Sequence, residues 1–192
     1  MIYALVDQET LQKRGASLQD LLIRINLLSA PLLQYRNKFG SLIEKQRALE
    51  EIRQHYTGKL IINDTIELIA YADGIHLGQE DMQKYSGDKS EAVMMIRRKI
   101  GDKVLGLSTH NRAEIQEANQ LDIDYIGLGA YRSTGTKRDA KVVGASLLEI
   151  AKLSKHPVAI IGGVRLEDEF ETPIDYKVIG SGLYGQPSMP LS

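Results

Sequence analysis

Residues 59–81 read "KLIINDTIELIAYADGIHLGQED", and this stretch decides the fold. Two short apolar runs, residues 59–63 and 74–77, are each followed at once by polar residues. Apolar runs of this length are typical of strands that are buried on both faces. The polar residues after each run are expected at the carboxyl end of a strand.

The same pattern recurs along the chain, with helical spacing between the runs. Leu18, Leu21, Leu22, Ile25 and Leu28 form one apolar helical stripe, for example. Strands that alternate with helices indicate a parallel sheet with right-handed crossovers. Eight such units predict a (β/α)8 TIM barrel, with an open doubly wound sheet as the alternative. The predicted strands are residues 2–6, 31–35, 59–63, 74–77, 103–108, 124–129, 157–161 and 176–180.

Helix starts are predicted from capping-box patterns, in which Ser, Asp or Asn precedes Glu or Asp by three residues. They begin at Ser17, Ser41, Asp64, Asn111 and Ser146. The stretch after the eighth strand, "SGLYGQPSMPLS", has no helical stripe, so the last helix is predicted to be absent or short. Apolar surface left by a missing helix favours a dimer or larger assembly.

The amino-acid composition argues against several classes of protein. The 192 residues include 24 Lys and Arg against 25 Asp and Glu, and no Cys. A net charge of −1 argues against a nucleic-acid groove, and the absence of Cys excludes disulfides and thiolate metal sites. No targeting pattern or membrane-spanning run is evident. The expectation is therefore a cytoplasmic protein with one barrel domain over residues 1–192 and no nucleic-acid or membrane partner.

Polar residues gather after the predicted strands, where barrel enzymes carry their reacting groups. They comprise cations, two carboxylates, hydroxyls and glycines, which suit phosphorylated ligands and Mg²⁺. Each has a simpler interpretation: Asp64 could cap a helix, Asp81 could lie in a turn, Ser108 could bond the next helical turn, and the cations could be solvated. The candidates are Gln34, Arg36, Lys38, Asn63, Asp64, Asp81, Ser108, Thr134, Thr136, Lys137, Gly163, Ser181 and Gly182.

These stretches resemble the thiamine-phosphate synthase and thiazole tautomerase family. The resemblance rests on "QYRNK" (34–38), "LIIND" (60–64), "ADGIHLGQEDM" (72–82), "GLSTH" (106–110), "DYIGLGAYRSTGTK" (124–137) and "AIIGGV" (159–164). It implies a Mg²⁺-assisted transferase that joins a hydroxymethylpyrimidine diphosphate to a thiazole phosphate. Diphosphate would leave first, which needs charge stabilisation more than acid–base chemistry.

The resemblance also implies residue roles. Gln34, Arg36, Lys38, Asn63 and Ser108 would contact the pyrimidine diphosphate, and Asp64 and Asp81 would hold Mg²⁺. Thr134, Thr136, Gly163, Ser181 and Gly182 would bind the thiazole phosphate, and Lys137 would act on the departing diphosphate. His76 is interpreted as a packed or hydrogen-bonded support, and Tyr125 as a packing residue.

Departures from the family pattern leave two alternatives. Arg132 stands where the family loop carries an aromatic residue, and Ala130, Ser133 and Gly135 stand at proline positions. A non-catalytic phosphometabolite-binding paralogue is therefore one alternative. The tautomerase is the other, because His110 matches its acid–base position.

Overall fold

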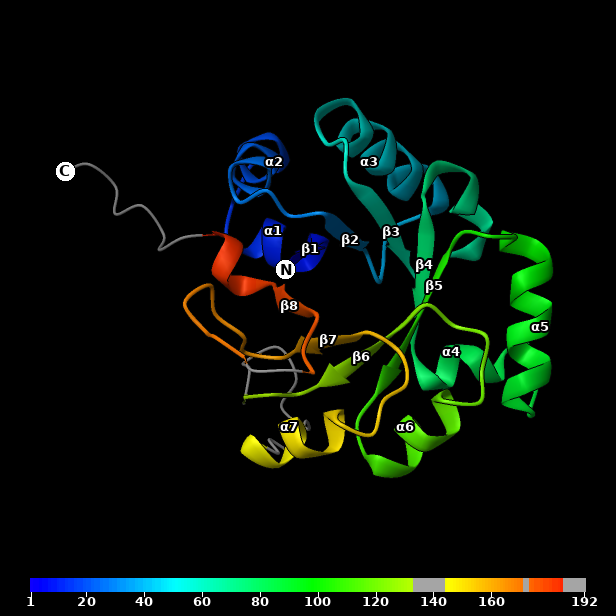
Figure 1. Ribbon diagram of the computed structural model, residues 1–192. Helices are drawn as coiled ribbons and strands as arrows, with labels where there is room; N and C mark the ends of the chain where they lie inside the picture. The colour runs from blue at the N-terminus through cyan, green and yellow to red at the C-terminus, as the bar shows by residue number, and fades with distance from the viewer. Residues whose placement is uncertain (133–143, 171–172, 185–192) are drawn as a thin grey trace.

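A computed structural model of the chain describes residues 1–132, 144–170 and 173–184. Eight parallel strands close into a barrel in the order β1 to β8, with β1 also pairing with β8 (Figure 1). This confirms the barrel and excludes the open doubly wound sheet. The strands are β1 (Ile2–Asp7), β2 (Leu32–Arg36), β3 (Lys59–Asn63), β4 (Gly74–Leu77), β5 (Val104–Thr109), β6 (Tyr125–Gly129), β7 (Val158–Ile161) and β8 (Tyr176–Ile179).

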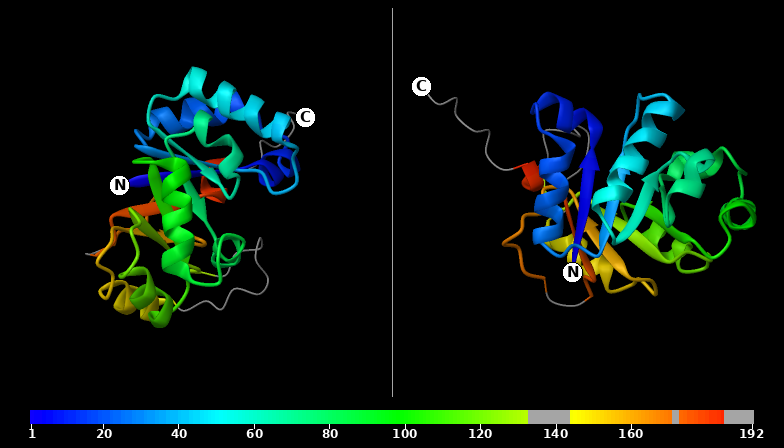
Figure 2. Two further views of the ribbon diagram at one scale, coloured as in Figure 1. Left: turned by 90° about the vertical axis from the view of Figure 1, so that its right-hand side faces the viewer. Right: turned by 90° about the horizontal axis from the view of Figure 1, so that it is seen from above.

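Most connections carry a helix on the outside of the strands, as two further views show (Figure 2). The segment after β3 is instead a 3₁₀ helix, and another 3₁₀ turn follows β8. The helices are α1 (Gln8–Lys13), α2 (Leu18–Leu27), α3 (Leu42–His55), η1 (Ile66–Tyr71), α4 (Gln79–Gln83), α5 (Lys89–Ile100), α6 (Arg112–Ala118), α7 (Ala145–Ala151) and η2 (Ser181–Tyr184).

Three of the five predicted caps are confirmed and two are wrong. Ser17, Ser41 and Asn111 each accept a hydrogen bond from the backbone N–H three residues on. At the fourth, η1 begins after Thr65 with no side-chain cap, because Asp64 adopts a left-handed backbone (φ +59°) that cannot lead into a helix as an N-cap. At the fifth, Gly144 rather than Ser146 occupies the N-cap of α7.

The connection after β7 carries no helix in its described residues, 162–170 and 173–175, although the (β/α)8 pattern implies one there. The orange connection between β7 and β8 runs as a loop on the left of Figure 1. Lys177 of β8 holds this loop by donating to the backbone oxygens of Leu166 and Asp168 at 2.6 and 3.0 Å. After β8, the described chain carries only η2, in agreement with the predicted lack of a full last helix. A second chain covering this side stays a prediction.

The hydrophobic core has two parts. The larger part lies between the strands and the surrounding helices and includes Leu22, Ile25, Leu49 and Ile96. The smaller part fills the inside of the barrel and includes Tyr3, Leu32, Ile61, Tyr125 and Val178. Tyr3 and Tyr125 are 1% and 3% exposed, so their hydroxyl groups are held deep inside the barrel and need partners there.

Two inward-facing glycines make room for large rings. A Cβ atom on Gly106 of β5 would lie 2.2 Å from Cζ of Tyr125. A Cβ atom on Gly127 of β6 would lie 2.9 Å from Cε1 of His76. Both separations are shorter than any van der Waals contact, so these positions must lack a side chain while the rings stay in place. Sequence reasoning left both glycines unassigned.

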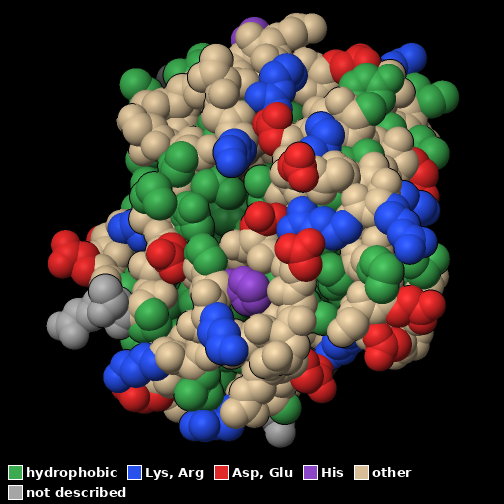
Figure 3. Space-filling model, turned by 45° about the vertical axis from the view of Figure 1, so that its right-hand side comes forward, with side chains coloured by type: hydrophobic (Ala, Val, Ile, Leu, Met, Phe, Trp, Pro, Cys, Tyr) green, Lys and Arg blue, Asp and Glu red, His purple; other side chains and the backbone are tan. Residues whose placement is uncertain are grey.

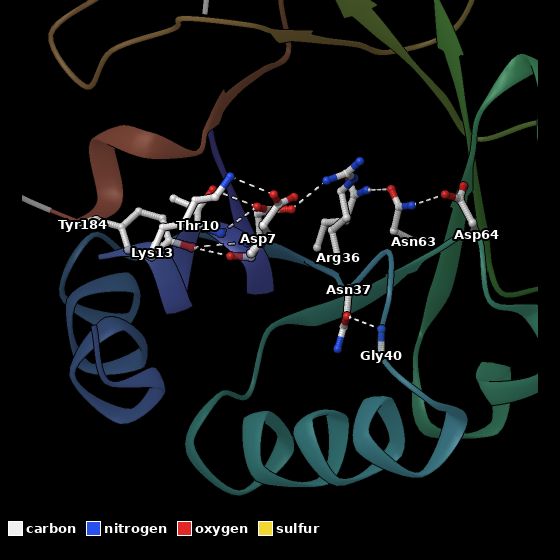
Figure 4. Close-up of polar contacts among 11 residues, drawn as sticks. Asp7, Thr10, Lys13, Arg36, Asn37, Gly40, Asn63, Asp64 and Tyr184 are labelled. Atoms are coloured by element: carbon white, nitrogen blue, oxygen red, sulfur yellow. Dashed lines mark hydrogen bonds and ion pairs between the residues drawn. The ribbon is translucent and has the colours of Figure 1, made fainter. Parts of the chain in front are cut away.

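Asp7 ties the end of β1 to three other elements. Its carboxylate caps α1 by accepting from the backbone N–H and the hydroxyl of Thr10, at 2.9 and 2.7 Å. Its other oxygen accepts from Arg36 Nη1 at 2.7 Å, and its backbone carbonyl accepts from the Tyr184 hydroxyl of η2 (Figure 4). Burial opposes ionisation, but the bonds from Thr10 and Arg36 outweigh it and lower the pKa of Asp7.

The surface is mixed in charge on the face shown in Figure 3, where Lys and Arg side chains are interspersed with Asp and Glu. This face carries no extended patch of one sign, as the near-neutral net charge predicts. In the described residues, no helix combines the length and apolar character that crossing a bilayer requires.

We expect Gly106→Ala to lower the free energy of unfolding by about 1–3 kcal/mol, because the added methyl group must displace the Tyr125 ring. Urea unfolding measures the change. Gly87→Ala is the matched control, since no atom lies within 4 Å of a Cβ placed there. Equal stability of the two variants would show that the interior accommodates the methyl group.

We expect Asp7→Asn to lower the free energy of unfolding at pH 7 by about 1–3 kcal/mol, through weakened charged hydrogen bonds to Thr10 and Arg36. The lowered pKa means that ionised Asp7 stabilises the fold above its usual pKa, and that this stabilisation is lost as the pH falls through the folded-state value. The difference from the unmodified protein should therefore vanish in strong acid. Glu9→Gln, which removes an exposed ion pair to Lys13, should change stability little at either pH.

Candidate active site at the mouth of the barrel

Asp64 follows β3 at the carboxyl end of the barrel, in a strained conformation. Its φ of +59° is uncommon for a residue with a side chain, and such strain is found preferentially at functional sites. Desolvation and the neighbouring Asp81 carboxyl group raise the pKa of Asp64 to about 6, against the opposing influence of the Gly78 N–H and of Arg36. The helix-cap interpretation of this residue is wrong, and another role is required.

Asp81 lies in the first turn of α4, which directly follows β4. Its carboxyl group lies close enough to that of Asp64 to raise the pKa of Asp64. Lys84, an exposed residue one turn on, pairs with Asp81 from the solvent side. Gly78 allows this approach, because a Cβ atom there would lie 3.0 Å from Asp81 Oδ2. The two predicted metal ligands are therefore brought together.

Two facing carboxyl groups fit a small divalent cation. When both are ionised they repel one another, and a cation between them removes that repulsion. Among the described residues there is no group of three or more His, Asp or Glu side chains that could hold a metal. A pair is nevertheless sufficient for Mg²⁺, which usually takes one or two carboxylates and fills its other positions with water and phosphate oxygens.

An amide pair joins β2 to the acidic pair (Figure 4). Gln34 Nε2 donates to Asn63 Oδ1 at 2.6 Å, and Asn63 Nδ2 donates to Asp64. Arg36, two residues after Gln34, points toward the same mouth and is held by Asp7. Lys38 is exposed with its ammonium nitrogen 5.6 Å from the centre of the Phe39 ring, and it forms no ion pair within the described chain. One cation is thus fixed in the mouth and one lies at its rim.

Ser108, at the end of β5, is half-buried and forms hydrogen bonds with two residues. One is His76 of β4, and the other is Gln79, at the start of α4. The hydroxyl group of Ser108 is 2.9 Å from His76 Nε2, and its backbone oxygen accepts from Gln79 Nε2 at 2.6 Å. The simpler interpretation, in which the hydroxyl bonds the next helical turn, does not describe this contact. The interpretation of His76 as a hydrogen-bonded support is confirmed, since its other ring nitrogen is 2.9 Å from the Tyr125 hydroxyl.

The ends of β6, β7 and β8 carry the predicted thiazole-phosphate residues. Gly163 and the preceding Gly162 both have positive φ, at +67° and +96°, and form a turn after β7. Arg132 donates to the backbone oxygen of Gly163 at 3.0 Å and pairs with Asp168, which fixes this turn. Ser181 and Gly182 lie exposed in η2. Thr134, Thr136 and Lys137 fall outside the described residues.

Sequence reasoning missed three residues of this region. Asp7 fixes Arg36, while Tyr3 and Tyr125 link the two sides of the site inside the barrel. The one available signal was alternation in "IYALVD", which places Tyr3, Leu5 and Asp7 on the same face of β1. His110, which matches the acid–base position of the tautomerase alternative, is exposed with its Nδ1 2.9 Å from Glu114 Oε2.

Comparison with known proteins places the sequence in one family. Residues 2–171 match the family model described as thiamine monophosphate synthase. Thiamine-phosphate synthase from Persephonella marina is 34% identical over 85% of this chain and 76% of its own length. The enzyme of the same name from Clostridium botulinum is 34% identical over the whole chain and 89% of its own length.

Solved structures agree on the fold. Thiamine phosphate pyrophosphorylase from Pyrococcus furiosus superposes with a TM-score of 0.76 at 21% identity, covering 97% of this chain and 89% of that one. The α-subunit of tryptophan synthase from the same organism gives a TM-score of 0.61 at 12% identity, over 94% of this chain and 87% of that one. The match of the family model over most of the chain, together with the two relatives, shows that this chain belongs to the thiamine monophosphate synthase family.

Proposed function

We propose that the chain condenses a hydroxymethylpyrimidine diphosphate with a thiazole phosphate to give thiamine phosphate and diphosphate, with residues 1–192 acting as one barrel domain. The observation that carries this proposal is the connected cluster at the ends of β2, β3 and β4. There a fixed cation, two amides and two facing carboxyl groups lie together. Such a cluster suits a metal-bound diphosphate.

The roles of the residues that bind the diphosphate follow from their charges. Arg36 and Lys38 neutralise the diphosphate oxygens, and Asp7 keeps the Arg36 side chain extended into the mouth. Asp64 and Asp81 hold Mg²⁺, which supplies positive charge to the leaving group when bound. The carbon–oxygen bond to diphosphate breaks with the electron pair leaving on oxygen, and the thiazole nitrogen then bonds to the resulting carbon cation. Arg36 and Lys38 favour this step because the leaving group gains negative charge.

The ring and phosphate ends of the site use other groups. Gln34 of β2, Asn63 of β3 and Ser108 of β5 orient the pyrimidine ring from the carboxyl-terminal side of the barrel, with His76 of β4 bonded to Ser108 between them. The thiazole phosphate is bound by Thr134, Thr136, the backbone N–H of Gly163, and Ser181 with Gly182. Lys137 acts on the departing diphosphate. The positive φ values at Gly162 and Gly163 support this assignment, because a glycine turn exposes backbone N–H groups to an anion.

Purified protein should form thiamine phosphate from the two substrates only when Mg²⁺ is present. Product is measured chromatographically, with EDTA as the metal-free control. Calorimetric titration of each substrate alone separates the alternatives. Binding of the thiazole phosphate without the pyrimidine diphosphate would favour the tautomerase, and binding of both with no product at high enzyme concentration would favour the non-catalytic paralogue.

Asp64→Gly should abolish Mg²⁺-dependent turnover, lowering kcat at least about 100-fold, while the melting temperature of the metal-free protein stays the same or rises. Glycine adopts positive φ without strain and removes the repulsion with Asp81, and these two gains offset the lost hydrogen bond from Asn63. Steady-state kinetics and thermal unfolding measure the two effects.

Glu67→Gln is the matched control, because Glu67 is an exposed carboxylate of the same connection and should affect neither property. A fall in melting temperature that accounts for the activity lost in Asp64→Gly would assign Asp64 a structural role instead.

A further inference from the structure

A continuous line of hydrogen bonds runs through the inside of the barrel and joins Ser108 to Asp64. It passes from Ser108 to His76 (2.9 Å), Tyr125 (2.9 Å), Tyr3 (2.7 Å), Gln34 (3.1 Å), Asn63 (2.6 Å) and finally Asp64. Tyr3 and Tyr125 are the buried centre of this line and contact neither carboxylate of the mouth directly. In the described residues, no buried side-chain nitrogen or oxygen lacks a partner.

The proton positions at the Asp64 end follow from the chemistry of the groups. A carboxylate oxygen accepts, so Asn63 turns its amide nitrogen toward Asp64 and its amide oxygen toward Gln34. Gln34 therefore donates from Nε2 to Asn63, and its Oε1 faces Tyr3. An amide oxygen accepts only, so Tyr3 gives its single hydroxyl proton to Gln34.

The remaining contacts are then determined in turn. Tyr3 has no second proton, so the Tyr125 hydroxyl donates to the Tyr3 oxygen. Tyr125 has now used its own proton, so the Nδ1–H of His76 donates to Tyr125. In a neutral imidazole ring with its proton on Nδ1, Nε2 is an acceptor, and the Ser108 hydroxyl donates to it. Burial raises the pKa of both tyrosines, which keeps their hydroxyl protons in place.

We propose that this single proton order makes Ser108 a hydrogen-bond acceptor toward the mouth, with Tyr3 and Tyr125 as the positioning residues that enforce it. Ser108 turns its proton inward to His76 and leaves its oxygen lone pairs facing the open side of β5. The site then takes a ligand that offers an N–H donor at this point and disfavours one that offers a carbonyl or ether oxygen. That this ligand is the pyrimidine ring of the diphosphate substrate rests on the proposed function.

The packing of the rings along this line of hydrogen bonds fixes the positions of their polar atoms. The His76 and Tyr125 rings are stacked at 5.5 Å between centroids, and each occupies the space left by an inward-facing glycine. Tyr3 meets the Tyr125 ring edge-on at 5.8 Å. These ring contacts leave each hydroxyl or ring nitrogen facing its partner in the line, so a change at Tyr3 is transmitted to Ser108 through bonds rather than through a movement of the backbone.

Removing the Tyr3 hydroxyl should move the His76 ring proton from Nδ1 to Nε2. In Tyr3→Phe, Tyr125 loses its acceptor and turns its proton to His76 Nδ1, the ring proton moves to Nε2, and Ser108 accepts instead of donating. Tyr176→Phe is the matched control, because Tyr176 also packs edge-on against Tyr3, at 6.3 Å, but lies outside the line. The tautomer is read from ring ¹⁵N chemical shifts of the ligand-free protein. The chain has four His, and loss of a signal in His76→Gln assigns the ring.

The expected result is His76 with its proton on Nδ1 in the unmodified protein and in Tyr176→Phe, and on Nε2 in Tyr3→Phe. A proton on Nε2 or on both nitrogens in the unmodified protein would overturn the proposal, as would an unchanged tautomer in folded Tyr3→Phe. If Tyr3→Phe does not fold, the spectrum of the unmodified protein still decides.

Steady-state kinetics separately test whether Ser108 selects a ligand that offers an N–H donor. Tyr3→Phe should raise KM for hydroxymethylpyrimidine diphosphate about tenfold, the effect of one misdirected hydrogen bond, and leave KM for the thiazole phosphate unchanged. Equal effects on both KM values would refute the specificity role of Ser108. A protein with no synthase activity but with the expected tautomers would refute the proposed function and leave the proton order standing.

Discussion

The approach of two carboxyl groups, Asp64 after β3 and Asp81 in α4, is the constraint around which the mouth of the barrel is organised. It places like charges together and, with burial, raises the pKa of Asp64, whose backbone is also strained at φ +59°. An arrangement that costs stability persists only where the surrounding structure enforces it. Here the enforcing contacts are the Asn63 amide, the Gly78 N–H and the absent side chain at position 78.

Hydrogen bonds through the interior of the barrel connect Asp64 to Ser108 on the other side of the site. The amides of Asn63 and Gln34 connect Asp64 to Tyr3. The stacked rings of Tyr125 and His76 connect Tyr3 to Ser108. A barrel interior is usually filled by branched apolar side chains. In this chain, part of that space holds a polar line whose every member has a partner, so the groups around the ligand are oriented before it arrives. Such pre-orientation suits a reaction that depends on placement and charge.

Much of the fold could be predicted because short apolar runs mark buried parallel strands directly. All eight predicted strands lie within one or two residues of those observed. The failures have local causes: the left-handed backbone at Asp64 prevents a cap, and Gly144 takes the cap expected at Ser146. In its described residues the connection after β7 departs from the (β/α)8 pattern, because its loop is held by Lys177 of β8, a contact that the sequence does not signal. The site was predicted at its polar strand ends, whereas Tyr3 and Asp7 act through partners that are distant in sequence.

We propose that Asp64 and Asp81 together form one binding site for a divalent cation beside the fixed Arg36 side chain. The most direct measurement is anomalous diffraction from crystals grown with Mn²⁺ and inorganic diphosphate. We expect a single strong anomalous peak from a metal ion that both carboxylates bind, with diphosphate oxygens between the metal and Arg36. A metal bound elsewhere, or diphosphate bound away from these three side chains, would contradict it.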